Sequence, residues 1–217
     1  MQHGCVLSEV LRAPGPTHSV FDVLAAATVL FSPGPRMAML GFAGGGMMAP
    51  LRKLGGEQAV EAVDLDADGF GVYQEVVGAW GGELAFAEAD AVTWLRRQGK
   101  RFDVIVEDLS VPIGKDVVKP GVSWDVLPGL MAKRVRAKGV IISNLLPTPG
   151  LSMKELERRC QILEPAVVVE LDRFHNRILI QGAGLGSARE MGKSLRSGLA
   201  ELRSRLADEI TVRSLEG

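Results

Sequence analysis

In the stretch "RMAMLGFAGGGMMAPLRKLG", Arg36 to Gly55, a glycine-rich turn joins a short apolar run to a helical pattern. Glycine backbone can approach a ligand closely, and the N-terminus of the following helix offers free N–H groups. Pro50 falls in the first turn of that helix, where a missing N–H costs little. The stretch therefore predicts a strand, a ligand-binding loop and a helix; a tight turn without a ligand is the alternative.

Short apolar runs alternate with helical patterns along the rest of the chain, which is typical of a parallel sheet built from βαβ units. We predict strands at 36–40, 59–65, 84–87, 102–107, 140–145, 166–171 and 177–181, and helices at 47–54, 68–80, 91–98, 124–137 and 153–163. Only "DRFHN" separates the last two strands, so they should form an antiparallel hairpin. The predicted fold is α/β and Rossmann-like, with a mostly parallel seven-stranded sheet, a terminal antiparallel hairpin and helices on both faces.

Three segments are expected in the 217 residues. Residues 1–16 form an amino-terminal extension, in which "GCVLSEVL" has the composition of a short strand, and residues 17–185 form the catalytic domain. In residues 186–217, apolar side chains recur every three or four positions, which predicts an amphipathic helix packed on the domain or at a homodimer interface. Residues 108–123 are expected to form a long functional loop without regular structure.

Composition narrows the classes of function. The formal net charge of −1 gives no general attraction to nucleic acid or to an anionic membrane surface. Cys5 and Cys160 show no paired spacing, the three histidines show no metal spacing, and no GxSxG elbow of a hydrolase occurs. The apolar run 20–31 contains Asp22 and is too short to span a bilayer. We therefore expect a cytoplasmic protein with no metal, no nucleic acid partner and no membrane association.

Acidic residues follow three successive predicted strands. Asp64, in "AVEAVDLDAD", stands where an acid accepts hydrogen bonds from ribose hydroxyls in nucleotide sites, whereas Asp66 could instead cap the next helix. Asp90, in "AEADAVTWL", could cap its helix, accept from an adenine amine, or do both. Asp108, in "FDVIVEDLS", follows the fourth strand at the reversal of strand order, where open α/β sheets place reacting groups.

The series "MLGFAGGGMMAPLRKL", "VDLD", "EADAVTWL", "RFDVIVEDLSVPIG" and "FHNRILIQG" resembles the spermidine synthase-like branch of the class I S-adenosylmethionine-dependent transferases, from about Phe21 to Gln181. The resemblance implies the class I methyltransferase fold and an adenosyl ligand, S-adenosylmethionine or its decarboxylated form. It also implies three sets of ligand-binding residues: the loop of Gly41, Phe42, Ala43, Gly44, Gly45 and Gly46; Asp64 with Leu65; and Asp90 with Ala91. Asp108 aligns with the aspartate that helps to deprotonate an acceptor amine.

The sequence departs from the aminopropyltransferases of that family at two positions. They carry an aspartate in the glycine-rich loop and another shortly after the catalytic one, where this chain has Gly44 and Val111. Each lost charge-assisted hydrogen bond is worth roughly 1.5–3 kcal/mol, so diamine binding should weaken by orders of magnitude.

Our leading hypothesis is therefore methyl transfer to a small-molecule acceptor, which could still be an amine. Aminopropyl transfer from decarboxylated S-adenosylmethionine and a non-catalytic adenosyl-binding module are the alternatives. An NAD(P)-dependent oxidoreductase is a weaker one, because no YxxxK pair accompanies the glycine-rich loop.

Overall fold

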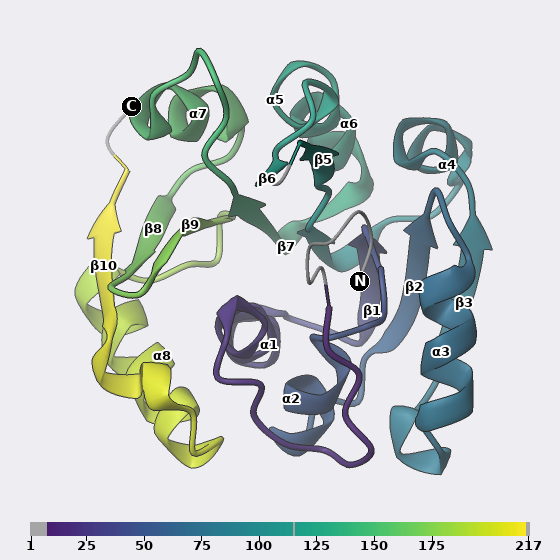
Figure 1. Ribbon diagram of the computed structural model, residues 1–217. Coiled ribbons are helices and arrows are strands. Elements are labelled where there is room, and N and C mark those ends of the chain that lie inside the picture. Colours follow the sequence, from purple (N-terminus) through teal and green to yellow (C-terminus); the bar gives the residue numbers. More distant parts are fainter. Residues whose placement is uncertain (1–7, 115, 216–217) are drawn as a thin grey trace.

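The computed structural model describes residues 8–114 and 116–215 and shows a central sheet with helices on both faces (Figure 1). The strands are β1 (Arg36–Leu40), β2 (Ala59–Asp64), β3 (Leu84–Glu88), β4 (Phe102–Glu107), β5 (Val111–Ile113), β6 (Asp116–Val118), β7 (Val135–Leu145), β8 (Ala166–Leu171), β9 (Phe174–Gln181) and β10 (Ile210–Ser214). The α-helices are α1 (Val20–Phe31), α2 (Met48–Lys53), α3 (Asp68–Val76), α4 (Ala91–Arg97), α5 (Val122–Asp125), α6 (Leu127–Arg134), α7 (Met153–Cys160) and α8 (Ala188–Glu201). Two 3₁₀ helices, η1 (Ala79–Gly81) and η2 (Arg205–Asp208), complete the elements.

The main sheet has eight strands in the order β10-β8-β9-β7-β4-β1-β2-β3. Strands β3, β2, β1, β4 and β7 run parallel, and β9 then pairs antiparallel with both β7 and β8. The order reverses between β1 and β4, so the carboxyl ends of these two strands form the crevice where open α/β sheets bind ligands. This arrangement confirms the predicted fold class, including the antiparallel hairpin.

Alternating side chains of each strand enter the cores on opposite faces of the sheet, as the two-residue repeat of a strand requires. Val104 and Val106 pack in the core formed with α1, α2, α3 and α8, whereas Ile105 packs in the core formed with α4 and α6. A third cluster joins α7 to β8 and β9. Because both faces are covered, β4 is buried along its whole length.

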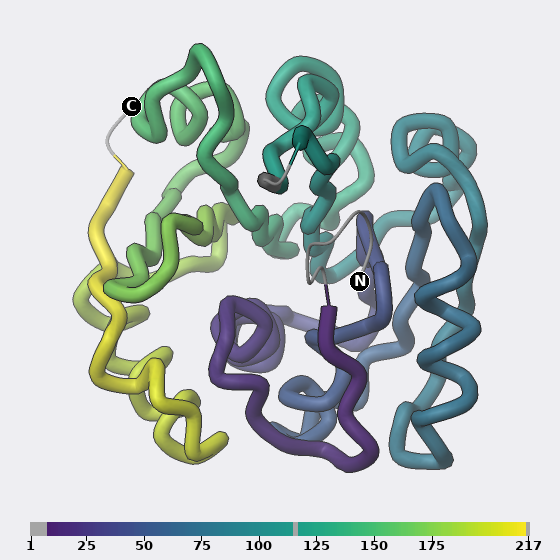
Figure 2. The backbone as a smooth tube through the Cα atoms, in the orientation of Figure 1, coloured from purple at the N-terminus to yellow at the C-terminus, as the bar shows by residue number. Residues whose placement is uncertain are grey.

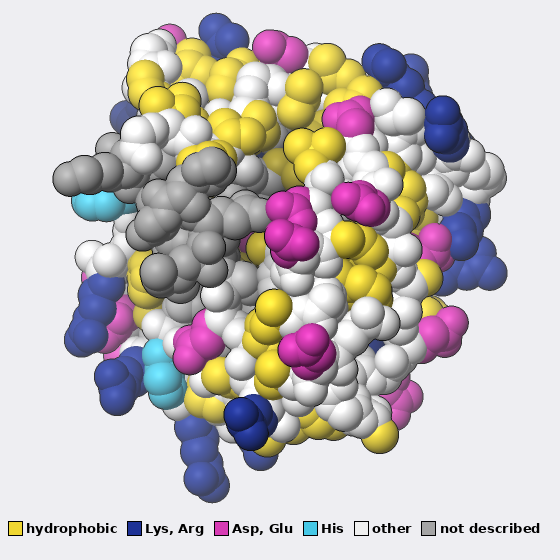
Figure 3. Space-filling model, turned by 45° about the vertical axis from the view of Figure 1, so that its right-hand side comes forward, with side chains coloured by type: hydrophobic (Ala, Val, Ile, Leu, Met, Phe, Trp, Pro, Cys, Tyr) yellow, Lys and Arg dark blue, Asp and Glu magenta, His cyan; other side chains and the backbone are white. Residues whose placement is uncertain are grey.

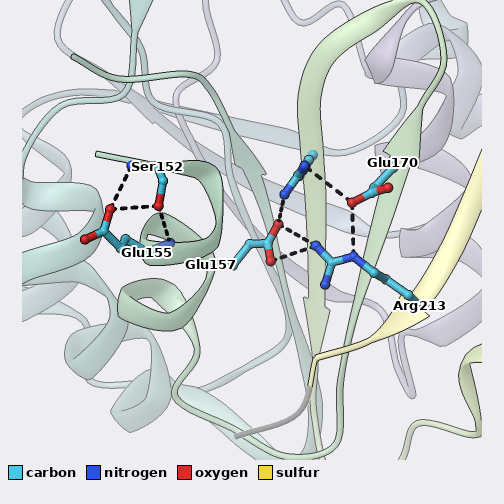
Figure 4. Close-up of polar contacts among 6 residues, drawn as sticks. Ser152, Glu155, Glu157, Glu170 and Arg213 are labelled. Carbon is cyan, nitrogen blue, oxygen red and sulfur yellow. Dashed lines mark hydrogen bonds and ion pairs between the residues drawn. The ribbon is translucent and has the colours of Figure 1, made fainter. Parts of the chain in front are cut away.

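The carboxyl-terminal segment corrects our prediction of a seven-stranded sheet and of an uninterrupted final helix. Helix α8 ends at Glu201, Arg203 takes a positive φ of 61°, and β10 pairs antiparallel with β8 as an eighth strand. Figure 4 shows Arg213 of β10 between Glu157, which is 1% exposed, and Glu170. The apolar residues that suggested one helix are buried in the core. Their spacing therefore predicted burial correctly, but it placed the end of the helix too late.

Two other predicted helices are shorter in the structure. The pattern at 124–137 divides into α5 and α6, because Pro128 begins a new helix, and Val135 then turns extended and starts β7. The helix predicted at 68–80 is α3, which ends at Val76. The η1 turn follows it, and there a Cβ at Gly81 would lie 2.7 Å from the Tyr73 hydroxyl. Propensity alone predicted longer helices, and packing with the sheet shortened them.

The segment 108–123 contains a short hairpin of β5 and β6, with Gly114 at a φ of 64°, so our prediction of a structureless loop is wrong. Residues 8–11 contain no strand, and the remainder of the predicted amino-terminal strand lies outside the described residues. The described amino-terminal segment passes beside α2 (Figure 2), where the Gly15 N–H donates to the Ala49 carbonyl at 3.2 Å. In the described part of the chain, no helix has the length and apolarity needed to cross a membrane.

Candidate functional site

The glycine-rich loop lies at the carboxyl end of β1 and bends through three residues with positive φ. Gly41 has a φ of 87°, Ala43 of 47° and Gly45 of 69°. A Cβ at Gly41 would lie 2.6 Å from the Asp108 carbonyl oxygen, so glycine here allows the loop to pass directly under the end of β4. The ring of Phe42 turns into the core and packs edge-on against Tyr73, Phe70 and Phe86. Only the backbone of Phe42 therefore remains at the surface of the crevice.

Asp64 at the end of β2 fixes this loop. Its Oδ2 accepts hydrogen bonds from the backbone N–H groups of Phe42 and Ala43, both at 2.7 Å. A carboxylate that accepts two backbone N–H groups makes strong charge-assisted bonds and satisfies donors that strand β1 leaves free. Its neighbour Leu65 has 69% of its surface exposed, which is unusual for a large apolar side chain at this edge. The structure thus brings the predicted loop, Asp64 and Leu65 together.

The amino-terminal segment covers the second half of the loop. The Gly46 N–H donates to Ser8 Oγ at 2.9 Å, and a Cβ at Gly44 would lie 2.9 Å from Val10 Cγ2. The absence of a side chain at Gly44 therefore has a structural reason in this chain, because an aspartate there would collide with Val10. It also follows that a ligand reaching the Gly46 amide must compete with Ser8.

Asp90 and Ala91 lie at the start of α4, where Asp90 is the N-cap. Its Oδ1 accepts from the Thr93 N–H at 2.8 Å, and this backbone hydrogen bond lowers the pKa of the Asp90 carboxyl. The Ala91 side chain is buried in the core beside Val92 and Leu95, so only its backbone could contact a ligand. The capping role predicted for Asp90 is confirmed, and the adenine contact remains a prediction.

Asp108 follows β4 directly, and its half-buried side chain meets the end of β7. The Asn144 Nδ2 donates to Asp108 Oδ1 at 2.7 Å. Loss of hydration raises the pKa of Asp108 to about 6, against the lowering effects of the Lys119 charge and the Asn144 hydrogen bond. The negative charges of Glu107 and Asp64 raise this pKa further. A carboxylate with a pKa near 6 is a better proton acceptor at neutral pH than an ordinary aspartate.

Glu107, the last residue of β4, forms a buried ion pair with Lys119, and both charges affect the pKa of the adjacent Asp108. The Lys119 Nζ is 2.8 Å from Glu107 Oε1, and both side chains have 0% exposure. The Ser123 hydroxyl and the Leu109 N–H also donate to Glu107 Oε1, at 3.0 and 3.2 Å. Because burying two charges costs hydration that their attraction rarely recovers, such a pair is weak evidence of stabilisation. The two charges act on the pKa of Asp108 in opposite directions, since Lys119 lowers it and Glu107 raises it.

Sequence reasoning missed Glu107, Lys119 and Asn144, and also Asn176, whose Nδ2 donates to Asn144 Oδ1 at 2.9 Å. Asn144 had a signal, since a polar residue interrupts the apolar run "VIISNLL" at a strand end. Lys119 had no such signal in the sequence, because its burial results only from the way the segment after β4 folds. Burial raises the pKa of the nearby Cys160 thiol to about 12, so this cysteine is not a nucleophile at neutral pH.

The face that carries α3 shows acidic and hydrophobic side chains side by side, with Lys and Arg side chains towards its margins (Figure 3). Within the ranges 8–114 and 116–215, no group of three or more His, Cys, Asp or Glu side chains is arranged to hold a metal ion.

No protein-family profile matches the sequence, and a sequence comparison with curated proteins finds no match. Solved structures do match. Human methyltransferase-like protein 13 in complex with SAH superposes with a TM-score of 0.62 over 86% of this chain and 91% of its own, at 17% identity. A probable spermidine synthase from Corynebacterium glutamicum gives a TM-score of 0.70 over 98% of this chain and 77% of its own, at 14% identity.

A spermidine synthase in complex with the transition-state analogue AdoDATO gives a TM-score of 0.61 over 88% of this chain and 66% of its own, at 12% identity. These likenesses show that the chain has the Rossmann-like fold of class I methyltransferases and spermidine synthases. The resemblance drawn from the sequence is thus confirmed at the level of the fold.

The residues at the carboxyl edge fit an adenosyl ligand in part. The exposed Leu65 side chain and the half-buried Asp64 carboxylate suit an adenine and its ribose, which need an apolar surface beside hydrogen-bond acceptors. Backbone N–H groups of the loop suit a carboxylate, although those of Phe42, Ala43 and Gly46 already donate to Asp64 and Ser8. The adenosine half of such a ligand is therefore better provided for than its tail.

Proposed function

We propose that the protein is an S-adenosylmethionine-dependent transferase that methylates a small-molecule acceptor. The observation that supports this best is the placing of Asp108 at the reversal of strand order, with a raised pKa and next to the loop that Asp64 fixes. Ligand-binding and proton-accepting groups thereby share one crevice, as a transfer reaction requires. The fold shared with methyltransferases and spermidine synthases is in keeping with this proposal.

The chain's own residues would act as follows. Asp64 and Leu65 hold the adenosine half of the ligand, and a tail group that reaches the glycine-rich loop takes the place of Ser8 at the Gly46 N–H. Asp108 accepts the proton of the acceptor group, while Asn144 orients its carboxylate by donating to Oδ1. When bound, S-adenosylmethionine supplies a methyl group on a sulfonium: the acceptor lone pair forms the new bond to carbon, and the carbon–sulfur pair stays on the neutral thioether product. Holding the two partners in line is then the main source of rate enhancement.

Methyl transfer is preferred to aminopropyl transfer for a structural reason. The two positions that carry amine-binding aspartates in the resembling aminopropyltransferases are Gly44, packed against Val10, and Val111, paired with Val118 in the hairpin. Neither offers a charge to an ammonium group. Aminopropyl transfer remains the second candidate, because of the match to a probable spermidine synthase over 98% of this chain.

Calorimetric titration with S-adenosylmethionine, decarboxylated S-adenosylmethionine, methylthioadenosine and NAD tests the proposal. We expect S-adenosylmethionine to bind most tightly and NAD not to bind. Tighter binding of the decarboxylated form would favour the aminopropyl alternative. Failure of every adenosyl thioether and sulfonium to bind would refute the proposed function, and binding without turnover on any acceptor would favour a non-catalytic module.

A further inference from the structure

A cleft of about 650 Å³ opens at the carboxyl end of β7. Its walls are β6, residues 146–153 before and at the start of α7, and residues 173–176 at the turn between β8 and β9. This volume is in the ordinary range for a small-molecule site. In the sheet, β7, β9 and β8 lie on the side of β4 away from β1.

A chain of hydrogen bonds joins the cleft to Asp108. Asn176, which lines the cleft, donates from Nδ2 to Asn144 Oδ1 at 2.9 Å, and Asn144 donates in turn to Asp108 at 2.7 Å. A carboxylate only accepts hydrogen bonds, so its contact fixes the Asn144 amide group with its oxygen towards Asn176. A molecule that contacts Asn176 in the cleft is thus separated from Asp108 by two amide side chains, those of Asn176 and Asn144.

The lining of the cleft is apolar with a basic margin. Its apolar members include Val117, Val118, Leu146, Leu151, Met153 and Phe174. Two basic residues, Arg173 and His175, also line it, and both side chains are exposed. One guanidinium nitrogen of Arg173 pairs with Glu209 at 2.8 Å, which leaves other N–H donors of its planar group facing solvent. Among the described lining residues, none is acidic.

We propose that this cleft binds the part of the acceptor remote from its reacting group, and that this part is apolar and carries a carboxylate, unlike the far end of a diamine or polyamine. This inference rests on the proposed transferase function. An apolar body gains from burial among the aliphatic and aromatic side chains, and its carboxylate lies near Arg173 and His175 at the margin. A second ammonium group would lose hydration in the cleft without an opposite charge to replace it.

Three probes of matched size test the inference: 3-phenylpropanoate, 3-phenylpropanol and 3-phenylpropylamine, titrated by NMR into protein saturated with S-adenosylhomocysteine. We expect the acid to bind at least tenfold more tightly than the amine, with the alcohol between them. Equal or tighter binding of the amine would overturn the inference.

An added negative charge locates the binding, and the same change elsewhere supplies the control. His175→Glu should narrow the preference for the acid at least threefold, whereas Gln74→Glu, the same charge change on the exposed face of α3, should leave it unchanged. No response to His175→Glu would mean that the probes bind elsewhere, and would overturn the inference. If S-adenosylhomocysteine itself fails to bind, the proposed function fails. In that case, titration of the same three probes into protein without S-adenosylhomocysteine still shows whether the cleft binds the acid more tightly than the amine.

Discussion

Asn144 donates a 2.7 Å hydrogen bond to Asp108, and the two residues come from the carboxyl ends of neighbouring parallel strands. The Asn144 amide thus orients the Asp108 carboxylate through its Oδ1. Both residues lie at the edge of the sheet where the strand order reverses. At the same time, loss of hydration raises the pKa of Asp108 to about 6. An aspartate that is oriented and made more basic is suited to proton transfer, which gives the following predictions.

Asp108→Asn should abolish turnover and leave binding of S-adenosylhomocysteine within about twofold. The asparagine has nearly the same shape and can still accept from Asn144, but it cannot take a proton from the acceptor. Calorimetry and a turnover assay on the same preparations check this. Asp125→Asn, an exposed change on α5, is the matched control and should leave both quantities unchanged. Full activity of Asp108→Asn would remove Asp108 from the proposed role.

The rate of transfer should fall as the pH is lowered through about 6, because the Asp108 carboxylate must be ionised to accept a proton. A profile of kcat/KM between pH 5 and 8 measures this. An ordinary aspartate would give a flat profile above about pH 5. A rate that stays constant down to pH 5 would therefore contradict the raised pKa.

The same shift predicts that Asp108→Asn stabilises the protein at neutral pH. The folded protein holds a proton on Asp108 up to about pH 6, whereas the unfolded chain loses it near the ordinary aspartate pKa of 3.8. Stability from this group is therefore complete below about pH 4 and is lost as the pH rises to about 6. We expect the variant to be more stable by about 1–2 kcal/mol at pH 7 and equal to the parent at pH 4. Urea unfolding at both pH values measures the difference.

Asp64→Ala should weaken adenosyl-ligand binding by about a hundredfold and lower the free energy of unfolding by about 1–3 kcal/mol, because two backbone N–H groups lose their acceptor. Asp64→Asn keeps a neutral acceptor oxygen and should recover most of the stability but little of the affinity. Asp68→Asn, exposed at the start of α3, is the control. Calorimetry and urea unfolding measure the two effects. Wild-type affinity in Asp64→Ala would exclude Asp64 from the ligand site.

Lys119→Met should raise the pKa of Asp108, since the Lys119 charge lowers it in the folded protein. Removing the lysine also leaves Glu107 buried without its partner, which should cost about 3–5 kcal/mol of stability. The double variant Glu107→Gln with Lys119→Met should recover part of that loss. The acid limb of the pH profile should move upward in the single variant, and an unmoved limb would show that the pair is purely structural.

The order of the elements, the parallel sheet and the candidate acids could be predicted from the sequence. Alternating apolar runs and helical patterns encode βαβ units, and the predicted strands at 36–40, 102–107 and 166–171 coincide with β1, β4 and β8. The glycine-rich turn and the acids Asp64, Asp90 and Asp108 carry local signals, because strand ends and N-caps depend on neighbouring residues. Our prediction of one long terminal helix was wrong because it rested only on the spacing of apolar residues. Such spacing indicates which residues are buried, and it does not show where a helix ends.

The contacts among these residues depend on the three-dimensional fold and could not be predicted from the sequence. Lys119 meets Glu107, and Asn176 reaches Asp108 through Asn144, across sequence separations that no local pattern records. Likewise, Ser8 and Val10 lie over the glycine-rich loop, which gives Gly44 a packing reason besides a ligand. The charge on a carboxylate and the shape of a cleft depend on what surrounds them in space. The identity of each residue is therefore a property of the sequence, and its pKa and partners are properties of the fold.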